Sequence, residues 1–79
     1  MDIDPIDAWQ EQERTRHVNA CIDALQPLFE DVMRGHAGID DSLRDARELV
    51  ERCAGSVSAI DDRARVKRAR RARGEDPFS

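Results

Sequence analysis

The sequence predicts an all-α protein: a coiled-coil-like, antiparallel two-helix hairpin that completes a bundle by dimerisation or by binding a partner. Three observations predict this fold class. Apolar residues recur in alternating steps of four and three along two segments, which is the period of helices packed along their length. A glycine-flanked break at residues 35–38 separates the two segments. With 79 residues, of which 39% are hydrophobic and 4% aromatic, the chain is too small to bury a large core by itself.

The first helix is expected at about residues 5–34. Asp4 can cap its N-terminus, and Pro5 suits the first helical position. Asp7 lies in the first turn, where the helix dipole favours a carboxylate. The predicted seam, meaning the stripe that faces the other helix, is formed here by Val18, Ile22, Leu25, Phe29 and Val32.

Pro27 interrupts the expected first helix. It falls on the side opposite the seam, so water can satisfy the carbonyl of Asp23, which loses its helical hydrogen bond. A kink at Pro27 and a break there, followed by a short helix, are both compatible with the sequence.

The second helix is expected at about residues 39–70. The glycine-flanked break before it suits a left-handed residue that ends the first helix. Asp40 and Asp41 then place carboxylates in the first turn of the second helix. Its predicted seam consists of Ile39, Leu43, Ala46, Val50, Cys53, Val57, Ile60 and Ala64.

The register of the hairpin follows from the position of the turn. A turn centred near residue 36 places Phe29 level with Leu43, so that apolar residues meet near the turn. Farther out, two polar residues fall opposite two apolar ones: Glu11 and Thr15 face Val57 and Ile60. We therefore expect a sufficient core between residues 18 and 53, and a deficient one in the outer part of the hairpin.

Some apolar residues do not fit into the seam. Cys21, Leu28 and Leu49 lie beside it and widen the apolar surface beyond what two helices can cover. A homodimer or a helix of another protein can complete the core. Trp9 lies in the acidic N-terminal segment of the chain, and either docks on a partner or folds onto the end of the second helix. The residues that we expect to contact a partner are Trp9, Leu28, Leu49, Val57 and Ile60.

The net charge of −4 is unevenly distributed. Residues 1–62 contain fifteen Asp or Glu against six Arg, whereas residues 63–73 contain seven basic residues and no acidic one. This Arg-rich segment predicts one of three roles: binding to nucleic acid, binding to an acidic protein surface of its own or a neighbouring chain, or no specific role. The residues of the nucleic-acid alternative are Arg63, Arg65, Lys67, Arg68, Arg70, Arg71 and Arg73.

No combination of residues in the sequence indicates catalysis. Cys21 and Cys53 are too few for a disulfide scaffold or a four-ligand metal site, but they lie at nearly the same level. They form either a reversible clasp between the helices or two small buried apolar residues. His17 and His36 are several turns apart, and no nucleophile lies at a suitable spacing from a base. We expect no catalytic residue, no metal, no cofactor and no enzymatic activity.

The first residues are acidic, which is atypical of a signal peptide, and no apolar run approaches the ~20 residues that span a bilayer. We therefore expect a cytoplasmic protein without membrane contact, and the Arg-rich, Lys-poor composition is typical of a bacterium or its phage. Residues 1–73 form one hairpin and residues 74–79 a flexible tail. The expected function is that of a small non-enzymatic adaptor, chaperone or regulator. The alternative is a dimeric nucleic-acid-binding protein.

Overall fold

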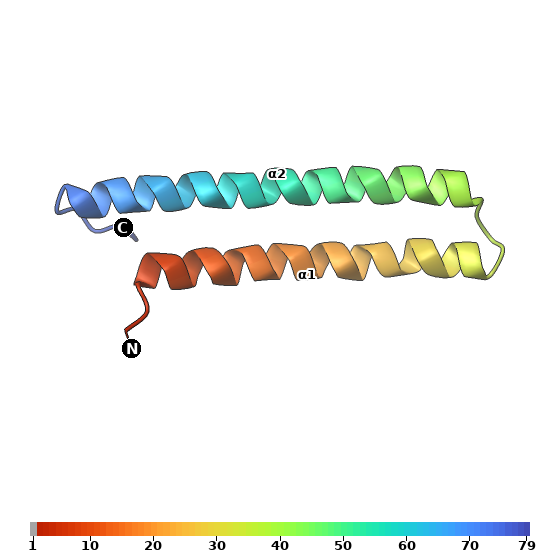
Figure 1. The fold of residues 1–79 in the computed structure, drawn as a ribbon, viewed down its shortest axis with the longest axis horizontal. Coiled ribbons are helices and arrows are strands. Elements are labelled where there is room, and N and C mark those ends of the chain that lie inside the picture. Colours follow the sequence, from red (N-terminus) through yellow and green to blue (C-terminus); the bar gives the residue numbers. More distant parts are fainter. Residues whose placement is uncertain (1) are drawn as a thin grey trace.

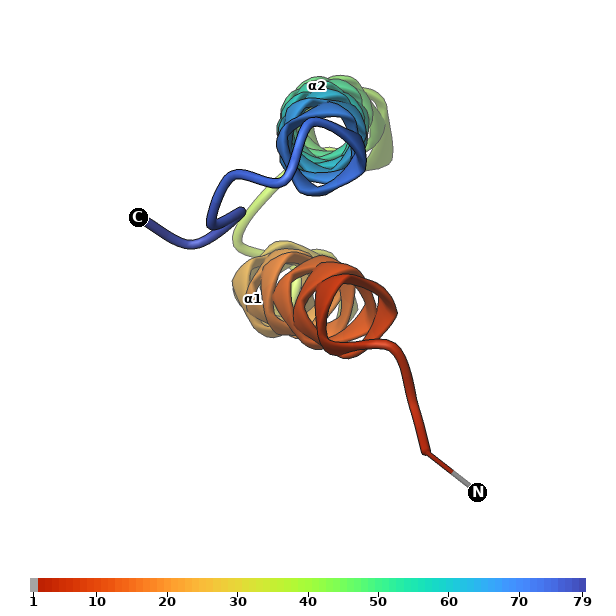
Figure 2. The same cartoon turned by 90° about the vertical axis from the view of Figure 1, so that its left-hand side faces the viewer.

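The computed structural model of the chain describes residues 2–79 and shows two long antiparallel helices joined by a short turn (Figure 1). Helix α1 is Pro5–Met33 and helix α2 is Ile39–Ala72. The two helices lie side by side along a rod of 57 × 23 × 18 Å, which is also visible end-on in Figure 2. The described residues contain no strand. The predicted all-α hairpin is confirmed.

The start of α1 follows from its first residues. The Asp4 carboxylate accepts a hydrogen bond of 2.9 Å from the backbone N–H of Ile6, and Pro5 occupies the first helical position, where no N–H is needed. Asp7 lies in the first turn, as expected. The helix therefore begins where the sequence predicts.

Both helices end in the same way, at a glycine in the left-handed region. Gly35 has φ +75° and Gly74 has φ +80°. After α1, the N–H of His36 donates to the carbonyl of Asp31 at 2.8 Å, and the N–H of Gly35 donates to Val32 at 3.1 Å. This pair of bonds is a Schellman motif, and it satisfies carbonyls that the helix end leaves free. The same pair recurs at the end of α2, from Gly74 to Arg71 and from Glu75 to Arg70.

Helix α1 continues through Pro27 without a break. The Pro27 side chain is exposed on the outer side of the hairpin. Water can therefore reach the carbonyl of Asp23, and the missing hydrogen bond does not end the helix. Of the two alternatives that the sequence leaves open, a break followed by a separate short helix is wrong.

The contact between the helices differs from the predicted seam. The α2 side chains that are buried or half-buried against α1 include Ser42, Ala46, Leu49, Cys53, Ile60 and Ala64. These residues recur at close to the ~3.6 residues per turn of a straight helix. The predicted stripe, with 3.5 residues per turn, drifts by ~20° per heptad around such a helix. Its members Ile39, Leu43 and Val50 therefore lie beside the contact and are exposed. The stripe and the contact share Ala46, Cys53, Ile60 and Ala64.

The expected division of the core is therefore wrong. In the outer part of the hairpin, Ile6, Ile60 and Ala64 are 1%, 2% and 0% exposed. Near the turn, where a sufficient core was expected, Ile22 and Leu43 remain 49% and 53% exposed. The outer part closes because Ile6 supplies apolar volume and because half-buried polar side chains fill the next turns of α1. These side chains are Gln10, Glu13 and His17.

Candidate functional site

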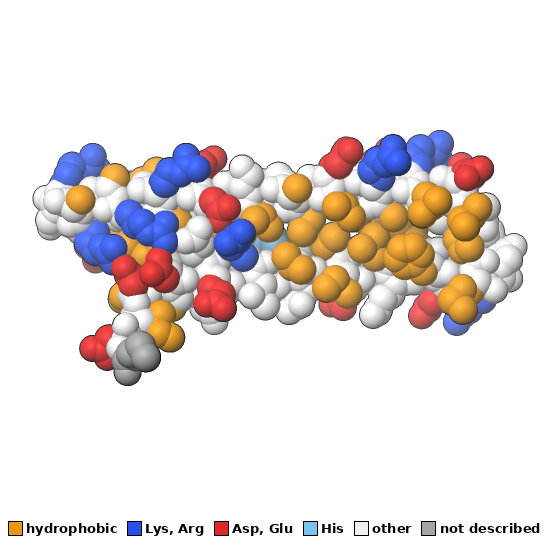
Figure 3. Space-filling view, in the orientation of Figure 1, with side chains coloured by type: hydrophobic (Ala, Val, Ile, Leu, Met, Phe, Trp, Pro, Cys, Tyr) orange, Lys and Arg blue, Asp and Glu red, His pale blue; other side chains and the backbone are white. Residues whose placement is uncertain are grey.

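One side of the hairpin carries two different surfaces (Figure 3). We call residues 4–17 together with residues 56–72 the terminal half, and residues 18–33 together with residues 39–55 the turn half. Orange side chains gather between the helices over the turn half, whereas red and blue side chains face each other over the terminal half. The two surfaces therefore divide this side of the molecule along its length.

Six large apolar side chains of the turn half form what we call the apolar face. Each helix contributes three of them at helical spacing, so that they lie on one side of that helix. All six are between 42% and 61% exposed although they belong to well-formed helices. The apolar face consists of Val18, Ile22 and Phe29 from α1 and Ile39, Leu43 and Val50 from α2.

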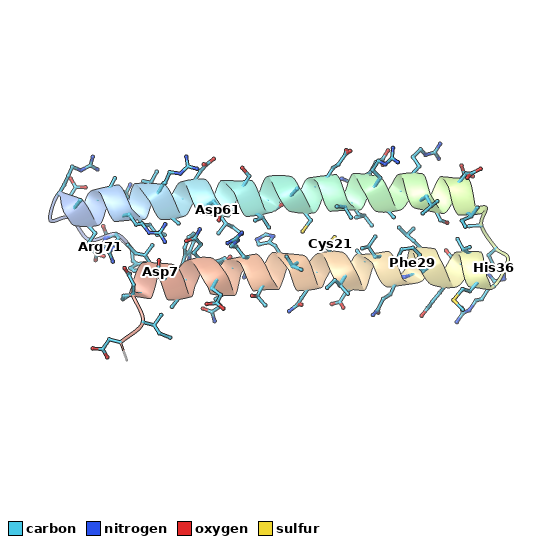
Figure 4. The ribbon with its side chains drawn as sticks, viewed as in Figure 1. Asp7, Cys21, Phe29, His36, Asp61 and Arg71 are labelled. Carbon is cyan, nitrogen blue, oxygen red and sulfur yellow. The ribbon has the colours of Figure 1, made fainter. Side chains whose placement is uncertain are left out.

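The two rows of the apolar face meet near the turn. There, a hollow of about 210 Å³ lies between the two helices, close to the Phe29 label in Figure 4. Ser42 is the only one of its lining residues with a polar side chain, and it is itself buried. A hollow of this size and chemistry fits an apolar side chain of another helix. It is lined by Phe29, Val32, Met33, Ile39, Ser42 and Leu43.

The terminal half is held together by charged and polar pairs across the helices. The Arg71 guanidinium donates to both carboxylate oxygens of Asp4 at 2.6 Å, and Arg68 pairs with Asp7. Figure 4 shows Arg71 and Asp7 at this end of the hairpin. Asp61 accepts a 2.7 Å hydrogen bond from Gln10. These pairs therefore connect the N-terminal part of α1 with the C-terminal part of α2.

The environment of Asp4 favours its charged form. The hydrogen bond from Arg71 lowers the pKa of this carboxyl below its ordinary value of 3.8, and the bond from the Ile6 N–H lowers it further. Asp4 therefore links the cap of α1 to the last turn of α2.

Most cations of the Arg-rich segment contact their own chain. Besides the pairs of Arg68 and Arg71, Arg65 lies 3.6 Å from Asp62, and Arg73 lies 3.3 Å from Glu75. Arg70 donates to the carbonyl of Ser79. Within the part of the chain that the structure describes, Arg63 makes no ion pair. The segment thus binds acidic groups of its own hairpin, which is one of the three roles considered from the sequence.

Lys67 joins both ends of the chain. Its ammonium lies 4.8 Å from the centre of the Trp9 ring and 5.0 Å from that of Phe78, and it donates to the carbonyl of Pro77. Such cation–π contacts are favourable over aromatic faces. Trp9 therefore folds onto the end of α2, and the C-terminal residues turn back over the same helix.

The two cysteines lie inside the helix contact and are free thiols. Cys21, labelled in Figure 4, donates to the carbonyl of Leu49, and Cys53 donates to that of His17. Burial raises the pKa of the Cys21 thiol above its ordinary value of 9.0, and the adjacent Cys53 thiol raises it further. Cys21 is therefore protonated at neutral pH, which makes it a poor nucleophile.

The predicted contact residues lie in different environments. Ile60 is 2% exposed, so it serves the hairpin itself and does not reach its surface. Trp9, Leu28, Leu49 and Val57 are half-buried at the helix contact or beside it. Several apolar residues that the sequence places in the seam, such as Phe29 and Leu43, are more exposed than these. The drift of a 3.5-residue stripe around a straight helix is the signal that identifies them.

Several kinds of site find no support in the described residues. Among residues 2–79, no three His, Cys, Asp or Glu side chains converge on a point where they can hold a metal ion. Neither helix contains a stretch that is long and apolar enough to cross a membrane. The chain matches no protein-family model, no curated protein and no solved structure.

Proposed function

We propose that this chain is a small cytoplasmic, non-enzymatic adaptor, chaperone or regulator that acts through helix–helix contacts with another polypeptide. The observation that best supports this role is the apolar face, whose six large side chains stay about half-exposed (Figure 3). Contiguous apolar patches on small proteins commonly mark interaction sites.

The shape of the apolar face suits a helical partner. One row of apolar side chains lies on α1 and one on α2, and the hollow near Phe29 lies between them at the turn end. A partner helix can lay its own apolar stripe along the two rows, with anchors at steps of three and four residues. Each Å² of apolar surface that is covered on binding contributes roughly 25 cal/mol of favourable free energy. Covering six half-exposed apolar side chains therefore favours association with a partner.

A site-specific crosslinking experiment tests this role. A photoreactive amino acid replaces Val50, on the apolar face, or Glu48, which is exposed on the outer side of the same helical turn. We expect Val50 to give a crosslinked product of one defined mass in cells, and Glu48 to give none. Products from both positions alike, or from neither position, would contradict the proposal.

Nucleic-acid binding by residues 63–73 stays a prediction and is our second candidate. The contacts of Arg68 and Arg71 with carboxylates of the same chain do not favour it, because a phosphate has to displace those carboxylates. A gel shift with DNA and RNA at low salt tests it. Salt-sensitive binding that is lost without residues 63–79 would support this candidate, and no shift would exclude it.

A further inference from the structure

We propose that the polypeptide that covers the apolar face is a second copy of this chain, in a four-helix bundle whose two turns lie at the same end. This inference rests on the proposed helix–helix function and names its partner. Two properties of the hairpin support a second copy as the partner: the position of the apolar face and the distribution of charge along the two helices.

The charge distribution makes the hairpin complementary to itself. Residues 2–13 contain five acidic residues and no basic one, whereas residues 63–73 contain seven basic residues and no acidic one. The antiparallel helices bring these segments to the same end of the rod, where Arg71 pairs with Asp4 and Arg68 with Asp7. This end of the rod therefore has an acidic segment on α1, the acidic strip, beside a basic segment on α2, the basic strip.

A symmetric dimer can use these strips in only one arrangement. A two-fold axis parallel to the helices places α1 of each copy over α2 of the other, antiparallel to it. The apolar faces then cover each other, and each acidic strip meets the partner's basic strip. An axis across the helices, with turns at opposite ends and full overlap, instead places each apolar face on the charged terminal half of the other copy.

One polar pair makes this arrangement specific. Glu11 is exposed, makes no ion pair within the described part of the chain, and lies seven residues before Val18 on the same side of α1. Arg65 lies four residues after Asp61 on α2, and its ion pair is the contact with its neighbour Asp62. The register of the hairpin puts Glu11 and Arg65 at similar levels along the rod. In the same-end dimer, Glu11 of each copy therefore approaches the partner's Arg65.

The side that carries the apolar face is large enough for a stable contact. The outline of the rod on this side, about 57 × 23 Å, leaves room for the roughly 800 Å² that each partner buries in a typical specific complex. The apolar half supplies the core of such an interface and the charged half supplies its polar part.

Sedimentation equilibrium of the full chain tests whether the dimer exists. We expect a mass twice the 9.0 kDa of one chain. Leu43→Asp on the apolar face should raise the dissociation constant of the dimer by about tenfold or more, since 1.4 kcal/mol corresponds to a factor of ten. Val66→Asp is the matched control, because Val66 is as exposed as Leu43 (52% against 53%) but lies outside the apolar face. Equal effects of the two substitutions would overturn the proposed interface.

A charge exchange tests the arrangement of the two copies. Glu11→Arg and Arg65→Glu should each weaken self-association, because like charges then meet twice in each homodimer. A mixture of the two variants should form a heterodimer as tightly as the original chain, because both contacts are again between opposite charges. A mixture that associates no better than the single variants would overturn the same-end arrangement.

The outcomes separate this inference from the function on which it rests. A mass of 9.0 kDa, together with crosslinks from Val50 to a different protein, would overturn the second copy but leave the helix–helix function standing. A mass of 9.0 kDa without any crosslink from Val50 would overturn both.

Discussion

The two halves of this hairpin use different interactions to hold the same pair of helices together. In the terminal half, Ile6, Ile60 and Ala64 are buried, and ion pairs such as Arg71–Asp4 cross from one helix to the other. In the turn half, small or half-buried residues make the contact, while Phe29 and Leu43 stay half-exposed beside it. One half therefore satisfies itself, and the other retains apolar side chains that a second polypeptide can cover.

The difference shows that an apolar stripe and a helix contact need not coincide. In the turn half, the stripe residues Ile39, Leu43 and Val50 stay exposed beside the contact, whereas Ala46 and Cys53 of the same stripe lie in it. Farther along α2, Ile60 and Ala64 of the stripe are fully buried in the contact. A single pattern thus supplies both the exposed face and the buried core.

The largest expected effect comes from breaking the self-contained half. Ile60→Ala should lower the free energy of unfolding by about 2–5 kcal/mol, because it leaves a cavity at a position that is 2% exposed. Ile22→Ala removes the same atoms from a side chain that is 49% exposed, and should cost about 1 kcal/mol in dilute solution. Urea denaturation of both variants checks the difference. Equal losses would contradict the contrast between the halves.

The next largest effect on the free energy of unfolding concerns two glycines, one in the turn and one inside α2. Gly35→Ala should cost about 1 kcal/mol, because φ +75° strains a residue with a Cβ atom. Gly55→Ala should instead stabilise the chain by about 1 kcal/mol, because Gly55 lies inside α2 with open space around its Cα. Thermal unfolding of the two variants should therefore shift in opposite directions. An unchanged or raised melting temperature for Gly35→Ala would show that the turn does not depend on a left-handed residue, and a lowered one for Gly55→Ala would contradict the second expectation.

The smallest effect concerns the ion pairs of the terminal half. The folded-state pKa of Asp4 lies below 3.8, so the contact of its carboxylate with Arg71 stabilises the fold above that pH. This stabilisation is lost as the pH falls through the lowered pKa. Arg71→Ala should raise this pKa part of the way to 3.8, since the bond from the Ile6 N–H remains. A carboxyl NMR titration measures both values. No change in the pKa of Asp4 would mean that Arg71 does not hold it.

Local signals in the sequence predicted the ends of the helices and their register. Asp4 and Pro5 define the start of α1, and the break after it contains the left-handed Gly35. Cys21 and Cys53, which were expected at one level, lie side by side in the helix contact. These features depend on residues close in the chain or on the position of one turn, so that a sequence pattern is sufficient to predict them.

The exposed and buried sides of the helices were not predictable in the same way. A step of three or four residues does not distinguish a seam of 3.5 residues per turn from one of 3.6 until it is followed over several turns. The burial of Ile6 also escaped prediction, because a polar stretch separates it from the apolar residues of α1. Half-buried Gln10 and His17 continue the contact across that stretch. The cross-helix ion pairs depend on long side chains with several possible partners, which spacing alone does not select.

We conclude that the terminal half closes on itself and that the turn half does not. The isoleucine methyl groups test it in one NMR experiment with a soluble paramagnetic agent, at low and high protein concentration. In dilute solution we expect strong broadening for Ile22 and Ile39 and protection of Ile6 and Ile60. At high protein concentration we expect Ile22 to become protected as well. If Ile60 broadens as strongly as Ile22 in dilute solution, the claim is contradicted.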